Sequence, residues 1–328
     1  MSSIDNVQQL LDWQPPIQSA LIENGILLPE TRVVIFGPAK AWKSMLSLHT
    51  AFALASGSDW FGFKTSAATT LKYQAELPKS LDRDRVAKYA RGANSYPPNV
   101  FFKTSYERVK LDTPWGTASL ARDIEEVKSR APNQHLVLIL DPLYKLLAGR
   151  ISDEYDVKKL QDNLDDLKSR YNFSIIIIHH SRLSRVDSSG VIIDLGSEEV
   201  MGSSYWNNWC DTMIRVKLLN PYTGADKVEL SFVLARNTET ILPKLHIQWS
   251  RVDLQPRVLK RIQPDFDEPS IRGLGEPSIR GLKEASGREV DAQRIRLKEG
   301  GLKDASAEAK GRHSIIDEPS GRGLEVDA

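Results

Sequence analysis

Residues 37–44 combine a leading glycine with a lysine and a hydroxyl, in the order Gly-Pro-Ala-Lys-Ala-Trp-Lys-Ser. The apolar stretch 32–36 precedes them and predicts a strand, and residues 43–56 have the apolar spacing of a helix. A loop between a strand and a helix can direct its backbone N–H groups at phosphate oxygens. In such a loop, Lys43 would contact the β- and γ-phosphates of ATP and Ser44 would ligate Mg²⁺. The expected phosphate-binding residues are therefore Gly37, Pro38, Ala39, Lys40, Ala41, Trp42, Lys43 and Ser44.

Trp42 departs from the usual pattern, which has glycine immediately before the lysine. A bulky residue is expected to fit there only if its φ is negative and its side chain points away from the nucleotide. The alternative is a degenerate loop that no longer binds phosphate. The lysine–serine pair and the flanking strand and helix favour a working loop.

Two carboxylates follow stretches that predict strands. Asp141 ends the apolar stretch 136–140, where it would support Mg²⁺ beside the phosphate loop. Glu76 follows the stretch 69–74, where it would act as the general base that activates the attacking water. Taken singly, an aspartate that ends a strand is common and a loop glutamate is usually solvated.

Two consecutive histidines end the β-branched stretch 174–178. A histidine at the carboxyl end of a buried strand can donate a hydrogen bond to a γ-phosphate, so His180, ahead of His179, is a candidate sensor of that phosphate. A structural histidine with satisfied hydrogen bonds is the alternative.

The order of the expected elements defines the fold class. Helices are expected at 81–91, 120–129 and 157–170, and strands at 100–103, 136–140 and 174–178, after the elements named above. Strands that alternate with helices indicate an α/β fold, with a mainly parallel twisted sheet and helices on both faces. Later strand-like stretches at 212–218, 228–235 and 244–249 indicate an antiparallel extension at one edge.

The composition changes near residue 257. All seven tryptophans and nine tyrosines precede residue 251, whereas the remainder repeats Glu-Pro-Ser-Ile-Arg-Gly-Leu at 268–274 and 276–282. We therefore expect one ATPase domain over residues 1–257, with a short lead-in at 1–30, and a disordered tail over 258–328. The alternative for the tail is a tether or an arm that binds a replication protein.

The overall composition excludes little. A net charge of +1 gives no whole-molecule evidence for nucleic-acid binding. The one cysteine, Cys210, rules out an intrachain disulfide and suits a reducing compartment. No apolar run approaches the length of a membrane span, so a cytoplasmic protein without membrane contact is expected.

These motifs together resemble the RecA-like ATPases of the hexameric replicative helicase group, most closely the RepA-type helicases of plasmids, phages and mobile elements. The resemblance covers roughly residues 13–250 and rests on the loop at 37–44, Gln-Ala-Glu-Leu-Pro around Glu76, Asp141-Pro-Leu and His-His-Ser-Arg at 179–182. It implies a RecA-like P-loop core, ATP hydrolysis with Mg²⁺, and self-assembly into a ring, with a hexamer expected and active sites between subunits.

Further roles are implied by the same resemblance. Arg236, which follows the stretch 232–235, would be an arginine finger that enters the neighbouring subunit's site. A surface arginine paired with a local acid is the alternative. The segment Gly202–Ser204, followed by Asp211, is similar to the segment after the DNA-facing loop. Single-stranded DNA would be contacted by basic loop residues, namely Lys145, Arg150, Arg182 and Arg185.

Two observations weaken the expectation of DNA contact. The same loops carry four acids, Asp187, Asp194, Glu198 and Glu199, and the large aromatics Trp206 and Trp209 are more typical of a core than of base stacking. Three interpretations stay open: a DNA helicase or translocase in replication of a mobile element, a regulatory ATP-binding module with little hydrolysis that controls a protein partner, and a recombinase-like filament protein.

Overall fold

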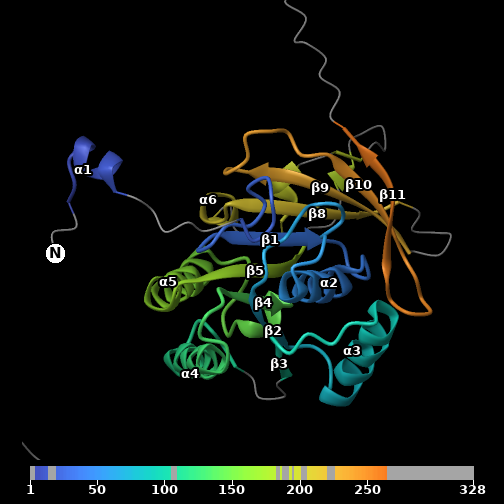
Figure 1. Ribbon diagram of the computed structural model, residues 1–328, viewed down its shortest axis with the longest axis horizontal. Helices are drawn as coiled ribbons and strands as arrows, with labels where there is room; N and C mark the ends of the chain where they lie inside the picture. The colour runs from blue at the N-terminus through green and yellow to red at the C-terminus, as the bar shows by residue number, and fades with distance from the viewer. Residues whose placement is uncertain are drawn as a thin grey trace, which may run out of the picture. The chain divides into compact units, whose positions relative to one another are not determined.

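The computed structural model describes residues 4–13, 20–104, 109–181, 185–186, 192–193, 196–200, 205–219 and 226–263. In these residues nine strands form one mixed sheet in the order β11-β10-β9-β8-β1-β5-β4-β2-β3. Figure 1 shows the part from β8 to β3 from top to bottom, with β11 at the right. The strands of this sheet are β1 (Arg32–Gly37), β2 (Thr69–Gln74), β3 (Val100–Thr104), β4 (Leu136–Asp141), β5 (Phe173–His180), β8 (Thr212–Leu218), β9 (Lys227–Ala235), β10 (Lys244–Trp249) and β11 (Pro256–Ile262). A separate hairpin pairs β6 (Arg185–Val186) with β7 (Ile192–Ile193).

Six of the strands are parallel, and the register sets their carboxyl ends at one edge. Gly37 at the end of β1 lies opposite His180 on β5, and Gln74 on β2 lies opposite Asp141 on β4. The strands β9, β10 and β11 continue the sheet in antiparallel fashion beyond β8. This arrangement is the expected fold class, and it collects the ends of β1, β2, β4 and β5 in one place.

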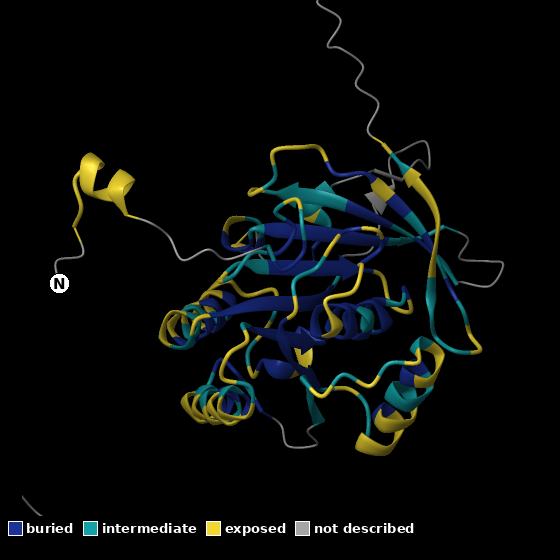
Figure 2. Cartoon of the chain, in the orientation of Figure 1, coloured by how far each residue is buried: buried dark blue, intermediate teal, exposed yellow. Residues whose placement is uncertain are grey.

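Helices lie on both faces of the sheet. They are α2 (Lys43–Ser56), α3 (Lys79–Ala93), α4 (Pro114–Arg130), α5 (Glu154–Tyr171) and α6 (Tyr205–Trp209), with 3₁₀ turns η1 (Leu143–Leu146) and η2 (Gly196–Glu199). A further short helix, α1 (Val7–Asp12), buries none of its residues. Alternate side chains of β1 enter different cores: Val33 and Ile35 pack with α2 and α3, whereas Val34 and Phe36 pack with α4, α5 and α6. Figure 2 shows the central strands buried and the outer faces of the helices exposed. No helix among the described residues is long and apolar enough to cross a membrane.

The central strands are buried because their sequences are apolar on both faces. Every residue of β4, Leu-Val-Leu-Ile-Leu-Asp, is buried, and so are the first seven residues of β5. Helix α5 places Val157, Leu160, Leu164 and Leu167 on its buried face, and Asp153 caps its first turn by accepting from two backbone N–H groups. These features confirm the strands and helices expected from the apolar patterns.

The expected boundary of the domain at residue 257 needs correction, and part of the expected lead-in is buried. The strand β11 crosses the expected boundary at residue 257, so the ordered domain extends at least to Gln263. Its side chains are mostly exposed because an edge strand is held by backbone hydrogen bonds, and it therefore lacks the apolar signal. The expected lead-in is partly core, since Leu21, Ile22, Ile26 and Leu27 are buried. Residues 264–328, which hold the repeats, lie outside the described residues.

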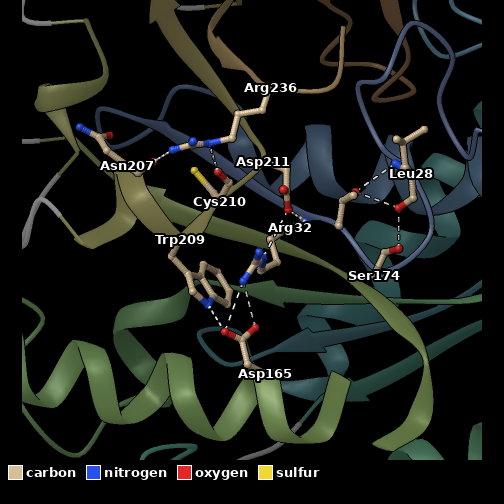
Figure 3. Close-up of polar contacts among 10 residues, drawn as sticks. Leu28, Arg32, Asp165, Ser174, Asn207, Trp209, Cys210, Asp211 and Arg236 are labelled. Atoms are coloured by element: carbon tan, nitrogen blue, oxygen red, sulfur yellow. Dashed lines mark hydrogen bonds and ion pairs between the residues drawn. The ribbon is translucent and has the colours of Figure 1, made fainter. Parts of the chain in front are cut away.

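A polar network joins the amino ends of β1 and β8 to α5 and α6 (Figure 3). The Asp165 carboxylate accepts from Arg32 Nη1 at 3.2 Å and from Trp209 Nε1 at 2.8 Å. Asp211 Oδ2 accepts from the Arg32 backbone N–H at 2.8 Å and from Arg32 Nε at 3.3 Å. The network orients the first residue of β1, and β1 in turn carries the loop 37–44.

Asp165→Ala should lower the free energy of unfolding by about 1–3 kcal/mol, because Arg32 and the Trp209 indole each lose a partially buried acceptor. Chemical denaturation of the purified chain measures the change. Asp162→Ala, one turn earlier on the same helix, is the matched control: its ion pair with Lys158 is exposed and should contribute less than about 0.5 kcal/mol. Equal losses in the two variants would contradict a special role for the network.

Candidate functional site

A cavity of about 640 Å³ opens where the carboxyl ends of the parallel strands meet helix α2. Loop residues 39–44 form one of its walls. Five segments of the chain contribute charged and hydrogen-bonding residues to it, among them Lys40, Lys43, Ser44, Glu76, Arg85, Asp141 and His180. The structure therefore brings together the expected phosphate loop, both expected carboxylates and the expected sensor histidine.

The loop between β1 and α2 has a backbone suited to an anion. Lys40 and Trp42 both have left-handed φ, 62° and 61°, and such residues allow N–H groups in a turn to converge on one concavity. Gly37 has to be glycine, because a Cβ there would lie 2.2 Å from the backbone oxygen of Val216 on the neighbouring strand. Close packing of β1 on β8 thus fixes where the loop begins.

Trp42 contradicts the expectation of a negative φ. Its φ of 61° is the left-handed conformation that glycine adopts easily, so the tryptophan keeps the backbone shape at a steric cost. The indole ring stacks on Trp249 of β10, with ring centroids 5.6 Å apart and ring planes 2° from parallel. This stacking offsets the backbone strain and ties the loop to the antiparallel part of the sheet. Trp42 also lines the cavity, so its side chain is not directed wholly away from it.

Lys43 begins α2, and its side chain folds back over the loop. Its Nζ donates to the carbonyl oxygens of Gly37 at 2.9 Å and Pro38 at 2.6 Å. Burial lowers the pKa of the Lys43 ammonium group to about 8, although Asp141 and Glu76 act in the opposite direction. A phosphate chain would replace the two carbonyls with charged acceptors, which form stronger hydrogen bonds with an ammonium group.

Asp141 is fully buried at the end of β4 and is contacted by three side chains. Its Oδ1 accepts from Ser44 Oγ at 3.0 Å, and its Oδ2 accepts from Ser47 Oγ at 2.9 Å and from Lys72 Nζ at 2.7 Å. Burial alone would raise the pKa of the Asp141 carboxyl, but Lys72 and the two hydroxyls hold that pKa below its usual range. The residue therefore presents a carboxylate next to the Ser44 hydroxyl.

Glu76 lies at the mouth of the cavity with an exposed carboxylate. Tyr144, in the 3₁₀ turn after β4, donates its hydroxyl to Glu76 Oε1 at 3.3 Å. The Tyr144 ring also meets the His180 ring edge to face, with centroids 5.2 Å apart. Burial lowers the pKa of the His180 imidazole and the nearby Lys43 lowers it further, against the opposing effect of Glu76 and Asp141.

The two consecutive histidines point to opposite faces of the sheet, as adjacent residues of a strand must. His180 lines the cavity, whereas His179 is buried against Trp206 with ring centroids 5.3 Å apart. His179 Nδ1 accepts from the backbone N–H of His180 at 2.8 Å. This geometry leaves His180 as the histidine that can meet a ligand in the cavity.

Arg236 lies away from its own chain's cavity. It follows β9, whose last residue pairs with Thr212 at the start of β8. Arg236 therefore lies near the amino ends of the parallel strands, whereas the cavity lies at their carboxyl ends. Its guanidinium donates to the carbonyl oxygens of Cys210 at 3.1 Å and Asn207 at 2.7 Å (Figure 3). The local partners are thus backbone carbonyls near the end of α6, and not the acid considered as the alternative.

The expected DNA-facing residues are only partly described. Arg182, Asp187, Asp194 and residues 202–204 lie outside the described residues, and so does the side chain of Arg185. Lys145 lies over the Tyr144 ring, with Nζ 5.2 Å from its centroid. Glu199 pairs with Arg215 at 3.3 Å. Trp206 and Trp209 are both buried, which confirms that these aromatics belong to the core.

Three residues at the site were missed in the sequence: Lys72, Arg85 and Tyr144. Lys72 had a usable signal, because a lysine inside the otherwise buried stretch 69–74 requires a charged partner. Arg85 is half-buried, lines the cavity from α3, and has no hydrogen bond or ion pair among the described residues. Neither stands out by residue type: Arg85 is one of several charged residues of a polar helix, and Tyr144 lies in a largely apolar segment.

The fold is similar to two solved structures. One, an ATPase domain, matches with a TM-score of 0.52 and 10% identity, over 72% of this chain and 85% of that one. The other, a DnaB-like replicative helicase studied for its interactions with primase, matches with a TM-score of 0.53 and 10% identity, over 72% of this chain but 59% of that one. At this identity the likeness concerns the fold, and it confirms the expected RecA-like architecture.

Sequence comparison identifies the family. No curated protein matches the chain significantly. A family model described as an AAA domain matches residues 3–185, which include the phosphate loop, Glu76, Asp141 and both histidines. Because this match spans more than half of the 328 residues, the chain belongs to the AAA domain family.

Proposed function

We propose that this protein is a magnesium-dependent ATPase that acts on DNA as a helicase or translocase, in the replication of a mobile element. The observation that carries the proposal is the meeting of Ser44 Oγ and the buried Asp141 carboxylate at 3.0 Å, in the cavity that also holds Lys43. A hydroxyl at the start of the helix that follows the phosphate loop and a carboxylate at the carboxyl end of another parallel strand are the pair that holds the metal of a P-loop nucleotide site.

The donor set fits Mg²⁺ in the presence of phosphate. Hydroxyl and carboxylate oxygens are ligands that Mg²⁺ prefers, and Asp141 is held in its charged form. Among the described residues no group of three or more His, Cys, Asp or Glu side chains could hold a metal by itself. Mg²⁺ bound here would bridge to the phosphate chain and neutralise charge that develops during phosphoryl transfer.

The remaining roles follow from position in the cavity. Lys43 would bind the β- and γ-phosphates after leaving the carbonyls of Gly37 and Pro38. The exposed Glu76 carboxylate, which Tyr144 orients, would accept a proton from the attacking water. His180 would donate to the γ-phosphate and so distinguish ATP from ADP.

Assembly and partners extend the proposal. Arg236 lies near the amino ends of the parallel strands, away from the cavity of its own chain, so it would reach a phosphate only in a neighbouring copy. That role requires release of its bonds to Asn207 and Cys210. The assembly that we propose is a homomeric ring, with six subunits. Single-stranded DNA is the proposed partner in the ring channel, and the tail at 264–328 is a candidate docking arm for a replication protein.

One observation favours a second function, a regulatory ATP-binding module with little hydrolysis. Lys43 is held by two carbonyls of its own loop, and Trp42 anchors that loop to Trp249. A loop held in this way would bind nucleotide slowly and could signal the bound state to a protein partner through β10. Turnover separates this module from a motor.

Steady-state ATP hydrolysis with Mg²⁺, with and without single-stranded DNA, tests the proposal directly. The wild-type chain should turn over ATP and be stimulated by DNA. Lys43→Ala should lose about 10²-fold or more in rate, because the phosphate chain loses its main cationic ligand. Glu76→Gln should lose about 10²–10⁴-fold while it still binds ATP, because only the general base is removed.

The outcomes distinguish the functions. If wild-type protein binds ATP but does not hydrolyse it under any of these conditions, the ATPase proposal fails and the regulatory module stands. If it hydrolyses ATP with no response to DNA and no DNA binding, the helicase or translocase part fails. Asp84→Asn, an exposed carboxylate on α3, is the control for loss of an unrelated acid.

The lowered pKa of Lys43 predicts proton uptake on ATP binding. With a pKa of about 8, this lysine is mostly neutral in the free protein at pH 9, and phosphates would raise its pKa and protonate it. Calorimetric titration at pH 9 in buffers with different ionisation enthalpies should therefore give an uptake approaching one proton, and much less at pH 7, where the lysine is already charged. A Lys43→Arg variant should show no such uptake, because arginine stays charged. Equal uptake in both proteins would contradict the assignment.

A further inference from the structure

Lys72 is a buried lysine whose only partner among the described residues is Asp141. Its side chain is 3% exposed, and its Nζ lies 2.7 Å from Asp141 Oδ2. Strand β2 pairs with β4 so that Lys72 lies opposite Ile139, two residues before Asp141. The lysine side chain therefore runs along the sheet toward the carboxyl end of β4, beneath the first turns of α2.

No other full positive charge contacts the Asp141 carboxylate among the residues that the structure describes. Ser44 and Ser47 contribute neutral hydroxyl donors, and Lys43 directs its ammonium group to the carbonyls of Gly37 and Pro38 instead. A buried carboxylate without a compensating cation is strongly destabilising. In the absence of a metal, Lys72 is thus the group that compensates the Asp141 carboxylate and holds it in place.

The same ammonium group affects a metal that approaches Asp141. Its charge already compensates the carboxylate, so a divalent cation gains less from Asp141 than it would from an unpaired acid. Among the described residues no group of three or more His, Cys, Asp or Glu side chains could hold the metal by itself. The charge needed to hold Mg²⁺ must then come from the phosphates.

We propose that Lys72 is the resident cation of the magnesium site: its ammonium group compensates and positions the Asp141 carboxylate without metal, and it prevents stable Mg²⁺ binding until a phosphate chain is present. This inference rests on the proposed function, because it concerns the metal of the same nucleotide site. Lys72 is a positioning residue in this account, since it acts through Asp141 and lines no part of the cavity.

The test uses thermal unfolding of the full chain without nucleotide, in EDTA or in about 10 mM MgCl₂. Lys72→Met removes the charge and keeps a similar apolar volume, and Lys72→Gln keeps a donor without charge. Lys103→Met is the matched control, because Lys103 lies on the adjacent strand β3 and pairs with Asp123 away from the cavity. The unfolding temperatures of wild type and Lys103→Met should change equally little when Mg²⁺ is added. Both Lys72 variants should unfold earlier in EDTA and regain about 5 °C or more with Mg²⁺, which would replace the missing cation.

Three results would overturn the proposal. The first is loss of stability in the Lys72 variants with no response to Mg²⁺, which would make the pair merely structural. The second is wild-type protein stabilised by Mg²⁺ as much as the variants. If neither variant folds, calorimetric titration of wild type with MgCl₂ alone decides: absence of binding below about 1 mM supports the proposal, and tight binding refutes it. Because no step measures hydrolysis, an inactive protein with the expected Mg²⁺ response would contradict the ATPase proposal and leave the role of Lys72 intact.

Discussion

A carboxylate removed from water has to be compensated by the groups around it, and Asp141 is compensated from two elements at once. Ser44 and Ser47 reach it from the first turns of α2, and Lys72 reaches it from β2. These contacts fix α2 over the sheet at the point where β1 ends, and so they fix the loop that precedes the helix. The buried charge thus positions the phosphate loop as well as the candidate metal site.

The loop itself stores strain that is offset elsewhere. A tryptophan in the left-handed conformation costs roughly 1–2 kcal/mol relative to its favoured backbone, and stacking of Trp42 on Trp249 offsets much of this. The stacking partner belongs to β10 in the antiparallel extension. A conformational change of the loop on nucleotide binding would therefore shift β10, while the hydrogen bonds of Arg32 hold the amino end of β1 in place.

Periodicity predicted most of the fold because the elements that matter are strongly apolar. Residues 43–56, 69–74, 212–218 and 244–249 form the expected elements with the expected ends. The strand β11 was missed since an exposed edge strand needs no apolar face. At the site, residue type and position at the end of a strand were sufficient to predict which residues would meet. Lys43, Ser44, Glu76, Asp141 and His180 all line one cavity. The φ of Trp42 was predicted wrongly, because the backbone shape of the loop prevailed over the preference of the side chain. Arg85 was not identified, because its approach to the cavity depends on how α3 packs.

The central claim is that a magnesium–nucleotide complex occupies the cavity above Asp141. A structure of the full chain with Mg²⁺ and a non-hydrolysable ATP analogue tests it most directly. Our account predicts that Lys43 Nζ leaves the carbonyls of Gly37 and Pro38 for the β- and γ-phosphates, and that Mg²⁺ lies beside Ser44 Oγ on the Asp141 side. An analogue bound elsewhere, or a cavity that excludes it while Lys43 keeps its carbonyl partners, would contradict the account.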